Sequence, residues 1–385
     1  MKIADYVENQ IKGLWGTDFD EDGIPVIKTN NLTYEGYIDY SDVCKRNIPR
    51  EQAKEWYLKP GDLLIEKSGG TKTHSVGYVS YFEGEINKYV CNNFILALRL
   101  KNTINSKFLF YQIQFKYDSN QFSDCFNKTT GIQNLKVKDY LDKEIKVFDV
   151  KKQAEIVREL DIIRSVIDKN KQILEKYDTL IKSRFIEMFG DISIGKYKFE
   201  TRKLGEVAEV GSSHRVFTTE FVEQGIPFYR GTEIGELANG KIPQEPYYIS
   251  EEHYQRLIAH DSKPQIGDLL MPSICNKGQV WMVDTEEPFY YKDGRVLSIS
   301  PNQEIYNSKY LQYFMREKTL IEYPKLGSGS TFAEFKIFLL KDIDVLTPPL
   351  VLQNNFASFV QQIDKSKFEI WLTLQNYGII EKRVF

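Results

Sequence analysis

The sequence predicts an α+β protein with two β-rich domains in a pseudo-twofold repeat, joined by two long helices that pair as an antiparallel coiled coil. Two observations support this fold class. Matching segments recur about 200 residues apart along the whole chain, and each copy ends in an apolar pattern with heptad spacing. We therefore expect β-rich domains at 1–149 and 193–346, and helical regions at 150–192 and 347–385.

The repeat consists of five pairs of segments that occur in the same order in both halves. The pairs are KIADYVE (2–8) with KLGEVAE (203–209), DGIPVIKTNNL (22–32) with QGIPFYRGTEI (224–234), KPGDLLIEKSGG (59–70) with PQIGDLLMPSICNKG (264–278), SKFLFYQIQ (106–114) with SKYLQYFMR (308–316), and Gln153 with Gln353. A spacing this long exceeds the period of solenoid and propeller repeats. It indicates duplication of a whole domain with its helix.

The first part of each copy is expected to be rich in short strands. Runs such as VGYVSYF (76–82) and QVWMVD (279–284) alternate apolar and polar residues, which is typical of half-buried strands. The chain has 24 tyrosines and 24 phenylalanines. We expect most of them to lie in the cores of these β-rich domains.

A long helix is predicted from about residue 150 to residue 189, capped by Asp149 at its start and ended by Gly190. At about 1.5 Å per residue, a helix of roughly 40 residues spans close to 60 Å and can hold two domains apart. Its apolar seam alternates steps of four and three and skips Arg184. The seam comprises Ile156, Leu160, Ile163, Ile167, Asn170, Leu174, Tyr177, Ile181 and Met188.

The second copy ends in a similar helix, with Thr347 and Pro348 expected as N-cap and first helical residue. Its seam comprises Leu352, Phe356, Phe359, Ile363, Ser366, Ile370 and Tyr377. Asn170 and Ser366 are polar positions within the two seams. They either set the register of the coiled coil or lie at its exposed edge.

Several classes of protein are disfavoured by the sequence. No run of 18 apolar residues occurs, and MKIADYVENQ lacks the apolar core of a signal peptide, so we expect a cytoplasmic protein. No phosphate-binding loop, dinucleotide fingerprint, HExxH or GxSxG motif is present, so no catalytic site is expected. The cysteines and histidines lack metal-site spacing and predict neither zinc nor disulfides. They are Cys44, Cys91, Cys125, Cys275, His74, His214, His253 and His260.

Polar loops recur at matching places and are the candidate DNA-binding site, since hydroxyls, amides, cations and glycine amides contact phosphates and base edges. The alternative is that these loops are simply flexible turns. The candidates in the loops after the two GDLL strands are Lys67, Ser68, Gly69, Gly70, Thr71, Lys72 and His74, and Ser273, Asn276 and Lys277. Those in the loops before the long helices are Lys128, Thr129, Thr130 and Lys136, and Ser328, Ser330, Thr331 and Lys336. Lys28 and Asn30 match Arg230 and Thr232 after the Gly-Ile-Pro turns, and His214 and Arg215 complete the set.

The overall charge does not favour a nucleic-acid-binding protein that acts alone. The formal net charge is −3 at pH 7, so no chain-wide basic footprint exists. Local patches, or a basic partner, would have to supply the affinity for phosphates.

The order of parts resembles the specificity subunit of type I restriction-modification enzymes across essentially the whole chain. The most telling segments are LIKSRFIEMFGD at the end of the first long helix and KLGEVAEV at the start of the second domain. The resemblance implies that the two β-rich domains are target recognition domains, each reading half of a bipartite DNA target. The helices would set the spacing between the half-sites.

The resemblance also implies partners and an absence of catalysis in this chain. Two methyltransferase subunits would bind the helical regions and carry S-adenosylmethionine, while restriction subunits that use ATP would join through the complex. This chain itself would hold no cofactor. A non-catalytic protein–protein scaffold without DNA readout is the alternative, and Arg158, Arg164 and Lys171 are expected on an exposed docking face of the first helix.

Overall fold

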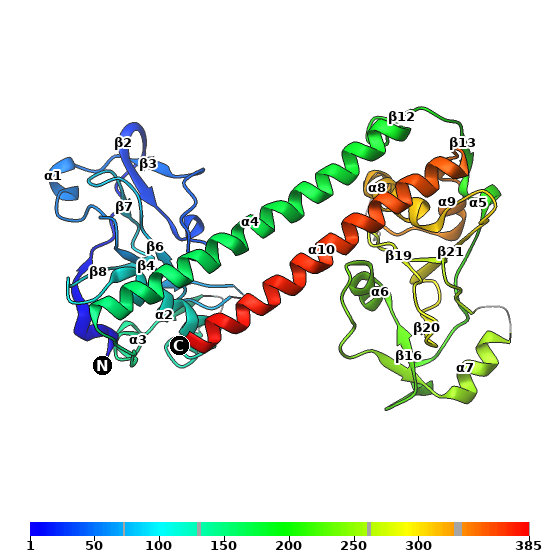
Figure 1. Ribbon diagram of the computed structural model, residues 1–385. Helices are drawn as coiled ribbons and strands as arrows, with labels where there is room; N and C mark the ends of the chain where they lie inside the picture. The colour runs from blue at the N-terminus through cyan, green and yellow to red at the C-terminus, as the bar shows by residue number, and fades with distance from the viewer. Residues whose placement is uncertain (72–73, 129–131, 260–262, 327–332, 385) are drawn as a thin grey trace. The chain divides into compact units, whose positions relative to one another are not determined.

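The computed structural model describes residues 1–71, 74–128, 132–259, 263–326 and 333–384 (Figure 1). The chain forms two compact units. The first contains Met1–Lys171 and Trp371–Phe385, and the second contains Gln172–Ile370. Helix α4 (Val150–Phe189) begins in the first unit and ends in the second.

Among its described residues, the first unit contains three small sheets with short helices between them. Its strands form sheets in the orders β1-β8-β4-β6, β3-β2-β7 and β5-β10-β9. The elements before α4 are η1 (Ile3–Tyr6), β1 (Val7–Ile11), β2 (Phe19–Ile27), η2 (Thr29–Asn31), β3 (Cys44–Arg46), α1 (Arg50–Ala53), β4 (Leu63–Glu66), β5 (Ser68–Gly69), β6 (Val79–Tyr81), β7 (Val90–Cys91), β8 (Ile95–Leu100), α2 (Ser106–Asp118), β9 (Phe126–Lys128), β10 (Gln133–Leu135) and α3 (Val137–Leu141).

The second unit repeats the main sheet of the first. Its order β14-β21-β18-β19 corresponds to β1-β8-β4-β6, and a second sheet has the order β15-β17-β16-β20. Its elements are β11 (Gly190–Asp191), β12 (Lys196–Tyr197), β13 (Thr201–Lys203), α5 (Leu204–Val207), β14 (Ala208–Gly211), η3 (Thr218–Glu220), β15 (Phe221–Val222), β16 (Ile226–Tyr229), α6 (Gly231–Ala238), β17 (Tyr247–Ile249), α7 (Glu251–Ile258), β18 (Leu269–Pro272), β19 (Trp281–Met282), β20 (Tyr290–Tyr291), β21 (Val296–Pro301), α8 (Ser308–Glu322), η4 (Tyr323–Leu326), α9 (Ile337–Lys341), β22 (Asp344–Leu346) and α10 (Leu350–Val384). The matching strand order confirms the predicted duplication.

The repeated GDLL segment is explained by a turn that leads into a buried strand of the main sheet. Gly61 and Gly267 have φ angles of 95° and 93°, which glycine adopts most readily. The Asp62 and Asp268 carboxylates each accept the backbone N–H three residues earlier at 2.8 Å. A Cβ at either glycine would lie 3.1 or 2.9 Å from the serine hydroxyl at the start of α2 or α8. The segment recurs because both copies need this turn, independently of any ligand.

Gln153 and Gln353 join each long helix to its own domain. The Oε1 atom of Gln153 accepts the Asn105 N–H at 2.8 Å, and that of Gln353 accepts the Asn307 N–H at 2.9 Å. Each Nε2 donates to the backbone carbonyl five residues earlier, at 2.7 and 2.8 Å. Because Asn105 and Asn307 are the N-caps of α2 and α8, each glutamine connects the starts of two helices.

The predicted bounds of the first long helix are confirmed, and those of the second need one correction. Asp149 accepts the Lys152 N–H at 2.9 Å, and Gly190 has a φ of 101°. The second helix begins at Leu350 rather than at Pro348. The Thr347 hydroxyl is not a cap; it shares a 2.7 Å hydrogen bond with the Tyr306 hydroxyl.

Within the second unit, the end of α4 and the start of α10 pack antiparallel against each other and against α8. The Phe185 and Phe356 ring centroids lie 5.4 Å apart, while Asp178, nearer the start of α4, pairs with Lys367, further along α10. Opposite residue orders along the contact establish the antiparallel direction. The predicted seam is wrong at the end of α4, because Phe185 and Phe189 are buried and the predicted Met188 is only half-buried.

Within the first unit, the seam of α4 packs on the domain itself. Ile156 and Leu160 are buried in the same cluster as residues of β4, β8 and α2.

The polar seam residue Ser366, in the second unit, donates its hydroxyl to the Gln362 carbonyl of its own helix at 3.2 Å. None of the described helices combines the length and apolar character that a bilayer span requires.

Candidate nucleic-acid interface

In the first unit the two predicted polar loops form one small sheet. Strand β5 follows β4 and pairs antiparallel with β10, with Ser68 opposite Asn134 and Gly69 opposite Gln133. The Ser68 hydroxyl donates to Asn134 Oδ1 at 2.6 Å. The loop after the GDLL strand and the loop before the long helix are therefore adjacent.

The same connection occurs in the second unit. The Ser273 carbonyl accepts the Phe335 N–H at 2.7 Å, and the Lys67 carbonyl of the first unit accepts the Leu135 N–H at 2.8 Å. Two segments far apart in sequence thus meet at equivalent places in both copies.

A carboxylate organises this meeting point in the second unit. Glu334 Oε2 accepts a hydrogen bond from Arg295 Nη1 at 2.8 Å and lies 3.5 Å from the Ser273 hydroxyl. Lys336 donates to the other oxygen. The hydrogen bond from Lys336, followed by the charges of Lys336 and Arg295, lowers the pKa of Glu334.

Lys28 and Arg230 occupy equivalent positions in the two folds, as predicted. Each follows a strand that pairs in parallel with another, β2 with β7 and β16 with β20. The backbone N–H of Lys28 is accepted by Asn31 Oδ1 at 2.9 Å, and that of Arg230 by Glu233 Oε2 at 2.8 Å. Both residues precede a short helix in the same way.

Their side chains have partners within the protein. Arg230 donates through Nε and Nη2 to the Glu233 carboxylate at 3.1 and 2.5 Å, and its guanidinium lies 4.5 Å from the centre of the Tyr247 ring. Lys28 Nζ lies 3.8 Å from Asp42. Arg230 therefore stabilises the start of α6 whatever else it contacts.

The remaining predicted residues lie in turns and at exposed positions. Thr71 and His74 close a turn, with the Thr71 N–H donating to the His74 carbonyl at 2.7 Å, and the His74 ring stacks on Tyr34 at 3.7 Å. Lys136 Nζ donates to the Asp124 carbonyl at 3.2 Å. The exposed residues are Asn30, His214, Arg215, Thr232, Asn276 and Lys277. Residues Lys72, Thr129, Thr130, Ser328, Ser330 and Thr331 lie outside the described residues, and Lys128 is described only as part of β9.

Glu66 is a buried acid beneath the first polar loop that sequence reasoning missed. Its side chain accepts the Gly70 N–H at 3.3 Å through Oε1, while Oε2 is buried with no hydrogen-bond partner among the described residues. Burial raises its pKa. The equivalent strand in the second unit ends in Pro272 where β4 ends in Glu66. An acid in only one of two otherwise matching strands is the sequence signal that could have identified Glu66.

Glu66→Gln is expected to stabilise the protein at pH 7 by about 1 kcal/mol, because it removes the cost of a buried, partly unpaired charge. The raised pKa means that ionisation disfavours the folded state. The gain should therefore be absent below the unfolded-state value of about 4.3 and appear as the pH rises through the folded-state pKa.

Urea unfolding at pH 4 and pH 7 measures this effect. Glu334→Gln is the matched control with the opposite sign, because its lowered pKa means that its ionised form stabilises the folded state. Equal stability of Glu66→Gln and the parent at both pH values would contradict the prediction.

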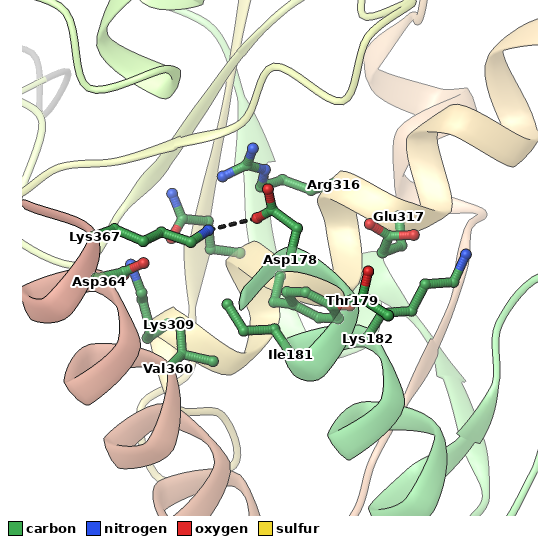
Figure 2. A pocket seen from close by; sticks show the side chains of 12 residues that line it. Asp178, Thr179, Ile181, Lys182, Lys309, Arg316, Glu317, Val360, Asp364 and Lys367 are labelled. Atoms are coloured by element: carbon green, nitrogen blue, oxygen red, sulfur yellow. Dashed lines mark hydrogen bonds and ion pairs between the residues drawn. The ribbon is translucent and has the colours of Figure 1, made fainter. Parts of the chain in front are cut away.

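A cavity of about 470 Å³ in the second unit lies where α4, α8 and α10 meet (Figure 2). Four of its charged residues form two pairs: Lys309 lies 2.9 Å from Asp364, and Lys367 bonds to Asp178. In the first unit, Lys107 of α2 similarly pairs with Asp161 of α4 at 3.0 Å. In both units, these ion pairs therefore join one helix to another.

The predicted docking face of α4 needs correction at Arg164. Arg164 lies 3.9 Å from the centre of the Tyr37 ring and donates to the Tyr37 hydroxyl at 2.6 Å, and Lys171 lies 3.7 Å from Glu35. The Arg164 side chain therefore holds the domain against the helix, whereas Lys171 is exposed as expected. Arg158 is exposed as expected.

The comparison with known proteins shows the family. The model of the type I restriction modification DNA specificity domain matches residues 17–177 and again 196–376. The MjaIX type I restriction enzyme specificity subunit of Methanocaldococcus jannaschii is 24% identical over 400 residues, covering 97% of this chain and 86% of that protein.

Solved structures agree on the fold. A chain from a study of complex assembly and conformational transition of the type I restriction-modification system matches with a TM-score of 0.56 at 16% identity, covering 100% of this chain and 95% of that one. The type I specificity subunit from M. genitalium matches with a TM-score of 0.53 at 15% identity, covering 100% and 93%. The scaffold alternative is set aside, because both copies match a DNA specificity domain. The chain belongs to the type I restriction-modification DNA specificity family and is a non-catalytic specificity subunit with two DNA specificity domains.

Proposed function

We propose that each unit reads one half of a bipartite DNA target through the loops that meet at the end of its main sheet. The proposal assigns recognition to 1–149 and 193–346, and spacing to the helical regions 150–192 and 347–385. The observation that carries it is the repeated meeting of two polar loops: Lys67 accepts the Leu135 N–H in one copy, and Ser273 accepts the Phe335 N–H in the other.

The proposed contacts combine backbone and side-chain groups of these loops with the cations that flank them. Hydroxyls, side-chain amides and backbone N–H groups suit phosphate and base contacts. The proposed residues are Lys28, Asn30, Lys67, Ser68, Gly69, Gly70, Thr71, Lys72, His74, Lys128, Thr129, Thr130 and Lys136 for the first half-site, and His214, Arg215, Arg230, Thr232, Ser273, Asn276, Lys277, Ser328, Ser330, Thr331 and Lys336 for the second.

The net charge of −3 supports a role within a larger complex. A duplex releases counterions only where cations neutralise its phosphates, so much of the affinity must come from partners. We assign this part to two methyltransferase subunits, which also carry S-adenosylmethionine, and assign ATP to restriction subunits that join the complex. We assign the protein to the cytoplasm, where such a complex would meet its DNA target.

Lys28→Ala and Arg230→Ala in the complex with methyltransferase subunits are expected to weaken recognition of the first and second half-sites respectively. A phosphate contact lowers affinity for all sequences alike, whereas an arginine on a guanine edge is worth about 1–3 kcal/mol of discrimination. Binding to duplexes with single base changes in each half measures both effects.

Glu233→Gln is the control for Arg230, because it weakens the same ion pair and leaves the arginine in place. If Glu233→Gln reproduces the loss seen with Arg230→Ala, the arginine acts by holding α6. If neither cation variant changes binding at its own half-site, these two residues are not DNA contacts.

A further inference from the structure

The residue directly before β8 in the first unit and the residue directly before β21 in the second unit occupy equivalent positions. The Phe94 carbonyl accepts the Lys67 and Ser68 N–H groups at 2.7 and 3.2 Å, and the Arg295 carbonyl accepts the Ser273 N–H at 2.8 Å. Strands β8 and β21 begin at the next residue in each case. The two copies therefore place phenylalanine and arginine at the same point of the fold.

This point lies among the proposed DNA-contacting loops. A Cβ added to Gly231, the residue after Arg230, would lie 3.1 Å from Pro272 Cβ and 3.8 Å from the Arg295 carbonyl. Arg295 also bonds to Glu334 in the loop before the long helix. Three of the segments assigned to DNA contact thus converge at Arg295.

The Arg295 side chain is both exposed and oriented. It is 58% exposed, while its partner Glu334 is 20% exposed and bonds to Nη1 at 2.8 Å. A guanidinium has five N–H donors in a fixed plane, so the bond to Glu334 orients the group and, among the described residues, leaves further donors to offer. An oriented, exposed arginine suits bidentate recognition.

Phe94 presents different chemistry at the equivalent point. It is 56% exposed, which is unusual for a large apolar side chain between polar loops. Its backbone N–H donates to Asn92 Oδ1 at 3.2 Å, and its carbonyl bonds hold the loop that follows β4. The exposed ring therefore belongs to a residue whose backbone N–H and carbonyl are both held by hydrogen bonds.

We propose that this position determines base preference in both half-sites: Arg295 donates to the O6 and N7 atoms of a guanine, and Phe94 packs on the methyl group of a thymine. The inference rests on the proposed function. It adds that the half-sites differ in chemistry at one matched position, hydrogen bonding in the second and apolar contact in the first.

The test uses the complex with methyltransferase subunits, first establishing the target of the parent protein by selection from random duplexes. Arg295→Ala is expected to lower the preference for guanine at one position of the second half-site by about tenfold to a hundredfold, with the first half-site unchanged. Phe94→Ala should relax a thymine preference in the first half-site only. Arg202→Ala, which removes an exposed arginine on β13 of the same unit, should change neither.

Arg295→Lys and Phe94→Leu guard against misfolding, since each keeps part of the side chain. Arg295→Lys should retain affinity and lose part of the guanine preference. A uniform loss across all sequences, or unchanged base preference, would overturn the assignment of Arg295 while leaving the proposed function standing. A parent complex whose sequence preference does not depend on this subunit would overturn the proposed function and this inference with it.

Discussion

Arg99→Ala is expected to destabilise the first unit by about 3–5 kcal/mol, because it leaves the buried Asp62 carboxylate without its cationic partner. The Asp62 side chain is only 2% exposed and accepts from Arg99 Nε and Nη2 at 3.0 and 2.7 Å. Arg99 also donates to the Tyr57 carbonyl at 3.0 Å. Because Asp62 forms the turn that starts β4, its loss of a partner should loosen the main sheet.

Hydrogen exchange read by mass spectrometry on the whole chain measures this effect, with the second unit as internal control. Peptides from β4 and β8 should exchange faster in the variant, and those from β18 and β21 should be unchanged. In the second unit the equivalent acid, Asp268, is hydrogen-bonded by Ser300 instead. Arg99→Ser should therefore cost less than Arg99→Ala; equal protection in all three proteins would refute the argument.

Gln353→Leu is expected to cost about 3 kcal/mol and to free α10 from the second domain. The side chain is fully buried and satisfies the Asn307 N–H at 2.9 Å and the Ile305 and Pro348 carbonyls at 2.9 and 2.8 Å. Each buried group left unpaired costs about 1–3 kcal/mol, and the three losses are not fully additive. Leucine has similar bulk, so the loss arises from hydrogen bonds rather than from a cavity.

The urea unfolding midpoint and the exchange of peptides from α8 and the start of α10 measure the outcome. Gln353→Glu keeps an acceptor for Asn307 but sets a buried carboxylate oxygen against the Ile305 and Pro348 carbonyls, so it should lose at least as much stability as leucine. Gln361→Leu, at an exposed position of the same helix, is the matched control and should change little. A loss for Gln361→Leu as large as that for Gln353→Leu would assign the effect to the helix surface instead.

The two copies show why some repeated residues are functional candidates and others are structural. Gly61 and Gly267 recur because the turn needs a positive φ beside the next helix. Gln153 and Gln353 recur because the start of each long helix must be joined to its domain. Exposed positions are under neither constraint, and there the copies differ, as Phe94 and Arg295 do.

The sequence by itself determined the duplication, the family and the first long helix, because these depend on spacing that is local or repeated. Heptad spacing identified α4 at its observed bounds, Val150–Phe189. Asp149 caps the start of the helix and Gly190 follows its end, as expected, because capping residues act within a few residues of a helix end.

Only the tertiary structure decided which side chains are engaged. Phe185, and not the predicted Met188, is buried in the core because α8 packs on the end of α4. The Arg164 side chain is not part of an exposed docking face because it packs on Tyr37. Arg230 matched Lys28 in sequence, yet its guanidinium is bound to Glu233. Partners far away in the chain, or on another face of a helix, are set by packing that no periodic pattern contains, and for that reason Arg295 could be identified only from the folded chain.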